Sequence, residues 1–206
     1  MATVDFNSAI YYSISDGKIC RQFKQPVEGA IERQTKTGRT VYEKFFKALK
    51  GRITDIQVRD TDFGKFWRVS LDDGSGTVEI LEFQYSSGYA NGFLMTLPNV
   101  DLTSDVVLAP SLKMEGDKKK TTLFVSHHGN PVKWAFTKDH PGGLPQLKKI
   151  KVKVKETWDD SDRMEFLEAM VKNQILPHLN AKKYDVVAET VTVTEDPEEE
   201  YGDVPF

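Results

Sequence analysis

Aromatic and cationic side chains come together in two neighbouring β-rich runs, KFWRVSL and TVEILEFQY. A tight turn at Gly74-Ser75 would pair the two runs so that Leu71 faces Val78 on an aliphatic inner face. The opposite face would then carry rings and cations together: Lys65, Phe66, Arg68, Phe83 and Tyr85. Flat rings can stack on unpaired bases, and cations beside them can follow a chain of phosphates. This face is the first candidate for a binding surface.

A second interpretation of the same rings remains open. The N-terminal hairpin or a C-terminal helix could cover this face, and the rings would then form a second core. The assumed pairing also places Trp67 on the inner face opposite Glu82. An indole facing a carboxylate in the interior indicates a β-bulge or a shifted register.

Three further groups of cations could contact phosphates. They lie in the predicted loop EGDKKK, in the polar segment ERQTKTGRT and in the alternating run KKIKVKVK. The residues are Lys118, Lys119 and Lys120, then Arg33, Lys36 and Arg39, then Lys151 and Lys153. Exposed cations of this kind would make the binding of a polyanion sensitive to salt. A solvated loop would explain the first group, and protection of an edge strand by charge is the interpretation we favour for the last.

The sequence offers little that could carry out covalent chemistry. It contains no phosphate-binding G-x-x-x-x-G-K-[ST] motif. His127 and His128 are adjacent, so on a strand they would point to opposite faces and make a poor metal pair. Asp159, Asp160 and Asp162 precede an amphipathic run, where helix capping explains them better than a magnesium cluster. We therefore expect no enzymatic activity, no metal and no cofactor, and a nuclease is the least favoured class.

The composition is that of a folded protein. Of 206 residues, 39% are apolar and 29% are charged. No apolar run approaches the roughly 18–20 residues of a membrane helix, and the N-terminal stretch lacks the features of a secretory signal. Cys20 is the only cysteine, which excludes an internal disulfide. We expect a cytoplasmic protein without membrane contact.

The charges are unevenly distributed along the chain. Eight of the 31 acids and none of the 28 Lys and Arg residues lie from Asp185 to Phe206, which leaves residues 1–184 with a net charge of +5. Such an asymmetry indicates either an anionic partner for the basic part or an acidic segment that only aids solubility.

Short β-rich runs separated by turn signals must position these side chains. Two of them join at Asp16-Gly17 as a predicted N-terminal hairpin. Five more strands follow from about residue 45 to 128, with a helical or irregular connector after the third, and Gly51 permits a bend in the first. This is the strand order of a five-stranded OB-fold Greek-key barrel. The sequence therefore predicts a mainly β fold.

After the predicted barrel, the spacing of apolar residues predicts one amphipathic helix at about residues 160–179, which Pro177 kinks or ends. KKIKVKVKE before it predicts a single alternating strand. We assign residues 1–184 to one nucleic-acid-binding domain and residues 185–206 to a disordered acidic tail.

The last residues of the sequence, GDVPF, carry a resemblance. They are similar to the acidic tip of bacterial single-stranded DNA-binding proteins, which finishes in Asp-Asp-Asp-Ile-Pro-Phe. Asp203 matches the last Asp, Val204 stands in for Ile, and Pro205 and Phe206 match. Viral replication proteins that bind single strands are similar in plan, with an OB barrel, a C-terminal helix and an acidic tail. The chain thus resembles a phage-type member of this class.

The resemblance implies a protein that coats and protects single-stranded DNA without sequence specificity in replication, recombination or repair. It also implies that Asp203, Val204, Pro205 and Phe206 bind replication or recombination proteins, in a bacterial host cytoplasm if the chain is phage-encoded. A homo-oligomer is compatible with it. The alternatives are an RNA-binding or nucleic-acid-chaperone OB module, and a protein-interaction adaptor that binds no nucleic acid.

Overall fold

The computed structural model describes residues 9–152 and 155–181, and in this part the chain is mainly β. The helical elements are α1 (Gly88–Thr96), a 3-10 turn (Leu97–Asn99), α2 (Ser161–Met170) and a π-helical turn (Val171–Ile175). The strands are β1 (Ile10–Ser15), β2 (Lys18–Phe23), β3 (Ile31–Gln34), β4 (Thr40–Phe46), β5 (Leu49–Thr61), β6 (Gly64–Asp72), β7 (Val78–Gln84), β8 (Val106–Glu115), β9 (Lys118–His127), β10 (Asn130–Pro131), β11 (Lys148–Val152) and β12 (Lys155–Asp159).

Ten strands form one continuous sheet in the order β10-β9-β8-β5-β6-β7-β1-β2-β4-β3. The five predicted strands are β5 to β9, and the connector after the third is the helix α1. The pairings β9-β8-β5-β6-β7 are all antiparallel, whereas β1 adds to β7 in parallel. In the described residues the sheet curls but does not close into the predicted barrel. The predicted mainly β fold class is confirmed.

The bend in β5 allows this strand to join two parts of the sheet. Residues Leu49 to Gly51 pair with β8, and the pairing with β6 begins at Arg52. A Cβ atom at Gly51 would lie 2.9 Å from the backbone oxygen of Asp72, so only glycine permits this close approach.

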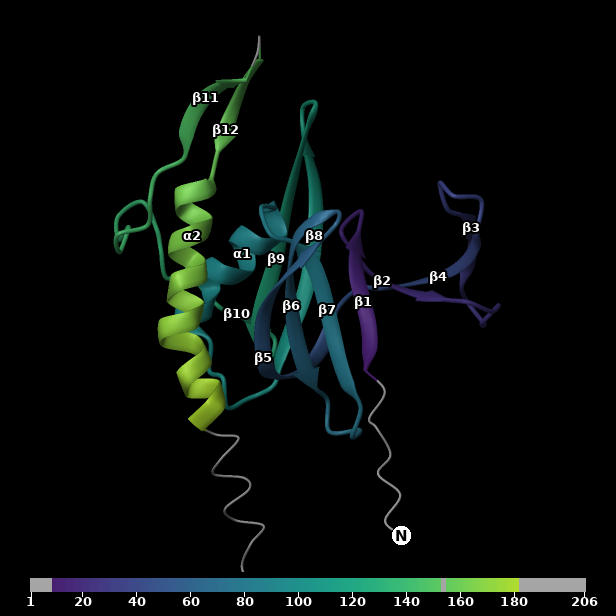
Figure 1. Ribbon diagram of the computed structural model, residues 1–206. Helices are drawn as coiled ribbons and strands as arrows, with labels where there is room; N and C mark the ends of the chain where they lie inside the picture. Colours follow the sequence, from purple (N-terminus) through teal and green to yellow (C-terminus); the bar gives the residue numbers. More distant parts are fainter. Residues whose placement is uncertain (1–8, 153–154, 182–206) are drawn as a thin grey trace, which may run out of the picture.

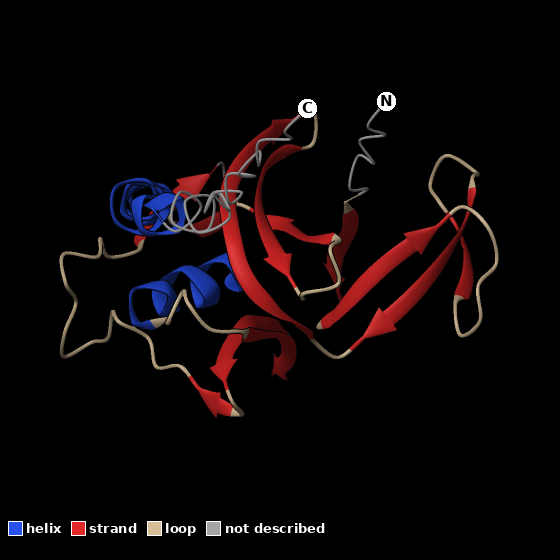
Figure 2. Ribbon diagram, turned by 90° about the horizontal axis from the view of Figure 1, so that it is seen from below, coloured by secondary structure: helices blue, strands red, loops and turns tan. Residues whose placement is uncertain are grey.

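The N-terminal hairpin is confirmed, with Ser15 paired to Lys18 across a two-residue turn. Asp16 and Gly17 in this turn both have positive φ, as a tight hairpin turn requires. The second strand of the hairpin, β2, also pairs with β4, and β4 pairs with β3; we call β2, β3 and β4 the N-terminal arm. Figures 1 and 2 show this arm standing away from the helices, on the opposite side of the molecule.

The register of β6 and β7 differs from the predicted one by a single residue. The connection is the loop of residues 73–77 rather than a two-residue turn, and Asp72 pairs with Val78. Asp72 and Asp73 accept hydrogen bonds from the backbone N–H groups of Gly74 and Ser75, which stabilises the longer loop. Trp67 consequently faces Phe83 instead of Glu82. The unfavourable Trp67–Glu82 pair was a correct indication of a register error.

The core lies between the concave face of the sheet and the two helices (Figure 1). Trp67 and Leu81 contribute from β6 and β7, Phe93 from α1, and Met164 and Leu167 from α2, all at 1% exposure or less. The helices therefore cover the face that carries Trp67 and Phe83 and leave the other face of β6 and β7 to the solvent side.

One prediction for the C-terminal part needs correction. The run KKIKVKVKE forms two antiparallel strands, because Lys148 to Val152 pair with Asp159 to Lys155 in a separate hairpin. The helix continues past Pro177 to residue 181. Since proline has no N–H and clashes with the carbonyl four residues earlier, the helix widens just before it, and the Leu176 N–H donates to the Val171 oxygen.

Candidate nucleic-acid interface

The solvent side of β6 and β7 carries part of the predicted surface. Phe66 lies half-buried opposite Gln84, and Arg68 lies opposite Glu82. The Arg68 Nε donates to Glu82 Oε1 at 2.6 Å, and its guanidinium lies 5.3 Å from the ring centroid of Tyr11 on β1. Tyr11 is 48% exposed, so this ring and Arg68 form an accessible aromatic–cation pair.

The other three residues predicted on this face lie on the inner side, which is a correction. Phe83 is 4% exposed and contacts Phe93 edge to face at 5.8 Å. Tyr85 stacks on Trp67 at 5.5 Å, and the Lys65 Nζ lies 5.3 Å from the Tyr85 ring. The one-residue change of register moved all of β7 to the other face, and with it Phe83 and Tyr85. In this structure Phe83 is not accessible to a base.

Lys118, Lys119 and Lys120 are exposed but lie on a strand. They begin β9, and the connection to β8 is the two-residue turn Gly116-Asp117. Lys120 donates to Glu115 at 3.0 Å, and Lys119 lies 3.5 Å from Asp16 of the β1–β2 turn. Surface pairs of this kind are weak, so phosphates can compete for these lysines.

The N-terminal arm holds Arg33, Lys36 and Arg39, all exposed. Arg33 Nη2 donates to Glu43 Oε1 at 2.6 Å, and this carboxylate is largely buried. Hydrogen bonding from Arg33 is the main reason why the pKa of Glu43 is lowered, against the effect of burial. Arg33 is therefore committed to the arm's own structure. Arg39 lines a cavity of about 610 Å³ with Phe23, Lys24 and Val41 among its neighbours.

The β11–β12 hairpin carries the last predicted group. Lys151 is exposed and pairs with Glu156 in register, and Lys153 lies outside the described residues. Lys149 on the same hairpin lies 5.2 Å from the Trp158 ring and 3.9 Å from Glu156. Since this hairpin forms a separate sheet, its charges do not extend the edge of the main sheet.

Sequence reasoning missed several exposed rings. Tyr11 belongs to them, and so do Phe63 (92% exposed), Phe124 (47%), Trp134 (46%) and Trp158 (58%). Phe63 is in the turn between β5 and β6, where a large apolar residue has no structural role, and this was a readable signal. Trp134 and Trp158 line one groove of about 360 Å³, which brings together residues that are distant in the sequence.

The three aspartates before α2 have structural partners. Asp159 accepts from the N–H and hydroxyl of Ser161, Asp160 accepts from the Ser86 hydroxyl, and Asp162 pairs with Lys148. Asp160 occupies the N-cap position but makes no side-chain bond to the helix, and it is Asp159 that bonds the first helical residue, Ser161. In residues 9–152 and 155–181, no cluster of three or more His, Cys, Asp or Glu side chains is placed to hold a metal ion.

The described helices are all too short or too polar to cross a membrane. Comparisons with protein-family models, with curated proteins and with solved structures found no match for this chain.

Proposed function

We propose that this protein binds single-stranded DNA without sequence specificity. The observation that carries the proposal is the pairing of exposed rings with cations: Arg68 with Tyr11 at 5.3 Å and Lys149 with Trp158 at 5.2 Å. On the N-terminal arm, Arg21 lies 4.7 Å from the half-buried ring of Phe23. A ring that is open to solvent can stack on any base, and the cation beside it can contact the adjoining phosphate. Rings and phosphates are common to all nucleotides, and for this reason we expect no sequence preference.

The strand order supports this proposal. The pairing β9-β8-β5-β6-β7, with a helix between β7 and β8, is the order expected of an OB-fold. OB-folds bind single strands through the face of their second and third strands and through the loops at its border. β6 and β7 take these places here, and Phe66 and Arg68 lie on their solvent side.

The proposal includes a role for the acidic segment. Residues 185–206, with Asp203, Val204, Pro205 and Phe206, lie outside the described residues. Their composition and their resemblance to the acidic tip of bacterial single-stranded DNA-binding proteins support recruitment of replication or recombination proteins. This function fits a protein of the cytoplasm, in a bacterial host if the chain is phage-encoded.

A titration with a fluorescent oligo-dT in rising salt tests the main function. We expect tight binding at low salt and a steady loss of affinity as salt increases. Binding of the protein releases salt cations from the DNA, and a higher salt concentration opposes this release. Matched RNA and duplex oligomers should bind more weakly. Preference for the RNA would favour an RNA-binding module. The absence of any binding at low-millimolar salt would reject the proposal and favour a protein-interaction adaptor.

A further inference from the structure

A groove between four elements lies away from the solvent side of β6 and β7. It lies among α1, β9, the segment after β10 and the junction of β12 with α2, and has a volume of about 360 Å³. We call it the tryptophan groove. Its walls include two large exposed rings, an aliphatic side chain and two cations: Trp134, Trp158, Leu147, Lys120 and Arg163. A volume of this size is typical of sites for small organic groups.

The backbone around the groove is held firmly. Next to Trp134, the Ala135 N–H donates to Met95 O at 2.8 Å, and Asn99 donates to Lys133 O at 3.0 Å. Trp158 is fixed by its place on β12, where it pairs with Lys149. The two rings are therefore presented by anchored segments, which reduces the entropy that binding would cost.

Two glycines of α1 allow this helix to lie close to β9 at the base of the groove. A Cβ atom at Gly88 would overlap the Thr121 carbonyl oxygen, and one at Gly92 would lie 2.9 Å from Thr122 Cγ2. Both threonines line the groove. Because α1 approaches β9 this closely, the groove has a tightly packed base that separates its lining from the core.

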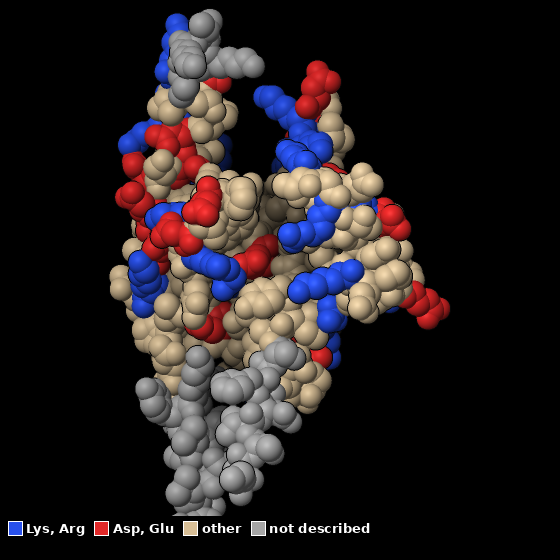
Figure 3. All heavy atoms as spheres, turned by 45° about the vertical axis from the view of Figure 1, so that its right-hand side comes forward, with Lys and Arg blue, Asp and Glu red and all other residues tan. Residues whose placement is uncertain are grey.

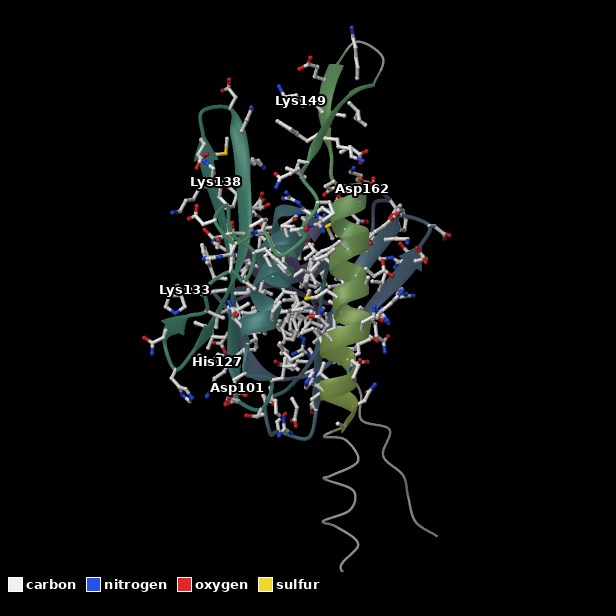
Figure 4. The ribbon with its side chains drawn as sticks, turned by 90° about the vertical axis from the view of Figure 1, so that its left-hand side faces the viewer. Asp101, His127, Lys133, Lys138, Lys149 and Asp162 are labelled. Atoms are coloured by element: carbon white, nitrogen blue, oxygen red, sulfur yellow. The ribbon has the colours of Figure 1, made fainter. Side chains whose placement is uncertain are left out.

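Lysines on two hairpins flank the opening, and several of them pair with neighbouring acids. The β8–β9 and β11–β12 hairpins project on the same side of the molecule, above α1 and α2 (Figures 1 and 4). Figure 3 shows a hollow between two projections that both carry Lys and Arg. One hairpin supplies Lys118, Lys119 and Lys120, and the other supplies Lys148, Lys149 and Lys151. The Asp160 carboxylate, at the edge of the groove, accepts a hydrogen bond from the Ser86 hydroxyl.

We propose that the tryptophan groove holds a base of single-stranded DNA between Trp134 and Trp158, while the adjoining phosphates contact the lysines of the two hairpins. This inference rests on the proposed function and adds a second contact region to the face of β6 and β7. Apolar rings within a border of cations are complementary to a base that is flanked by phosphates. Such a site would also make the β11–β12 hairpin a part of the DNA-binding surface.

Tryptophan fluorescence reports directly on this groove. The chain has three tryptophans, and Trp67 is only 1% exposed, so both accessible indoles line the groove. We expect oligo-dT to quench the fluorescence of the wild-type protein. Trp134→Phe and Trp158→Phe should each lower the quenching, and the double variant should lose nearly all of it, while a phenyl ring keeps the shape of the site.

Affinity provides the second measurement. Trp134→Ala and Trp158→Ala should each weaken binding of oligo-dT by about 5- to 150-fold, since a base stacked on an aromatic ring contributes about 1–3 kcal/mol. Phe124→Ala is the matched control, because this ring is equally exposed, lies on β9 and does not line the groove. It should weaken binding far less than either tryptophan variant, because it leaves the groove unchanged.

The outcomes separate the two proposals. If the wild-type protein does not bind oligo-dT, the proposed function fails and this inference fails with it. If the wild type binds, yet shows no quenching and both alanine variants keep its affinity, the groove is not a base site and only this inference is overturned. Should an alanine variant fail to fold, the quenching of the phenylalanine variants decides the question.

Discussion

Phe66 and Phe83 are the residues at which the corrected register matters most. Phe66 is half-buried on the solvent side, whereas Phe83 is 4% exposed against Phe93. We expect Phe83→Ala to lower the free energy of unfolding by about 3–5 kcal/mol, as for a large ring removed from a core. Phe66→Ala should change stability far less and should weaken oligo-dT binding by about 1–3 kcal/mol. Urea unfolding and DNA titration of both variants measure the two effects.

The opposite assignment would give the opposite result. If Phe83→Ala left stability unchanged and lost DNA affinity, the originally predicted register would be correct. Arg68→Ala serves as a companion to Phe66→Ala, because its guanidinium already contacts Glu82 and Tyr11, and its removal changes charge without opening a cavity.

The sequence could predict which residues alternate but not which pairs face each other. Alternation separates Phe66 and Arg68 from Trp67 and Val69 without knowledge of the turn. The facing residues on β7 depend on the length of the connection, and the stretch DDGSGT can form either a two-residue turn or the observed five-residue loop of residues 73–77. Asp72 and Asp73 favoured the longer loop through side-chain bonds that no periodicity records.

At the level of elements, one hydrogen-bonded group joins α2 to the sheet. The hydroxyl of Tyr85, the residue after β7, donates to Glu168 Oε2 at 2.7 Å, and Lys172 Nζ lies 2.6 Å from Glu168 Oε1. Burial by itself would raise the pKa of Glu168, but the bonds from Lys172 and Tyr85 outweigh it and the pKa is lowered. Burial, followed by the bond to Glu168, raises the pKa of Tyr85.

Tyr85→Phe should therefore reduce stability in a pH-dependent way. A carboxyl whose pKa is lowered by folding stabilises the protein above its unfolded pKa of about 4.3, and this contribution disappears as the pH falls further. We expect the variant to lose about 1.5 kcal/mol near pH 7, the lower end for a hydrogen bond to a charged group. The difference from wild type should shrink below about pH 4. Denaturant unfolding from pH 7 to pH 3 measures it, and a constant difference would contradict the role of Glu168.

Elements with a clear period were predictable, and those that depend on one special residue were not. The strands β5 to β9 follow from alternation and turn residues, and the helix from its apolar face. The run KKIKVKVKE alternates without interruption, so nothing in it marked the reversal between Val152 and Lys155. Likewise, Pro177 indicated a disturbed helix but not its form, which is a π-helical turn that keeps Val171 and Ile175 in the core.

For the whole molecule, the distribution of charge is more informative than its total. The N-terminal arm and the residue after it, 18–47, hold eight Lys and Arg residues against three Asp and Glu, a net charge of +5. This equals the entire positive excess of residues 1–184. The arm stands away from the helices (Figure 2), so a polyanion could be held both on the arm and on the body. The groove with Trp134 and Trp158 was not predictable, because it is assembled from segments that meet only in the folded chain.

The acidic segment provides the last test at this scale. Its eight acids are tethered to the basic body, and a tethered anion competes with DNA at a high effective concentration. Removal of residues 185–206 should therefore raise the affinity for single-stranded DNA, and for duplex DNA as well, most clearly at low salt where charges are least screened. A variant with Ser and Gly in place of the acids, at unchanged length, should behave like the truncated protein if charge is the cause. Titration of the full chain, the truncated protein and the Ser/Gly variant at two salt concentrations decides between these outcomes. Equal or weaker binding after truncation would show that the acidic segment does not compete with DNA for the Lys and Arg residues of the body.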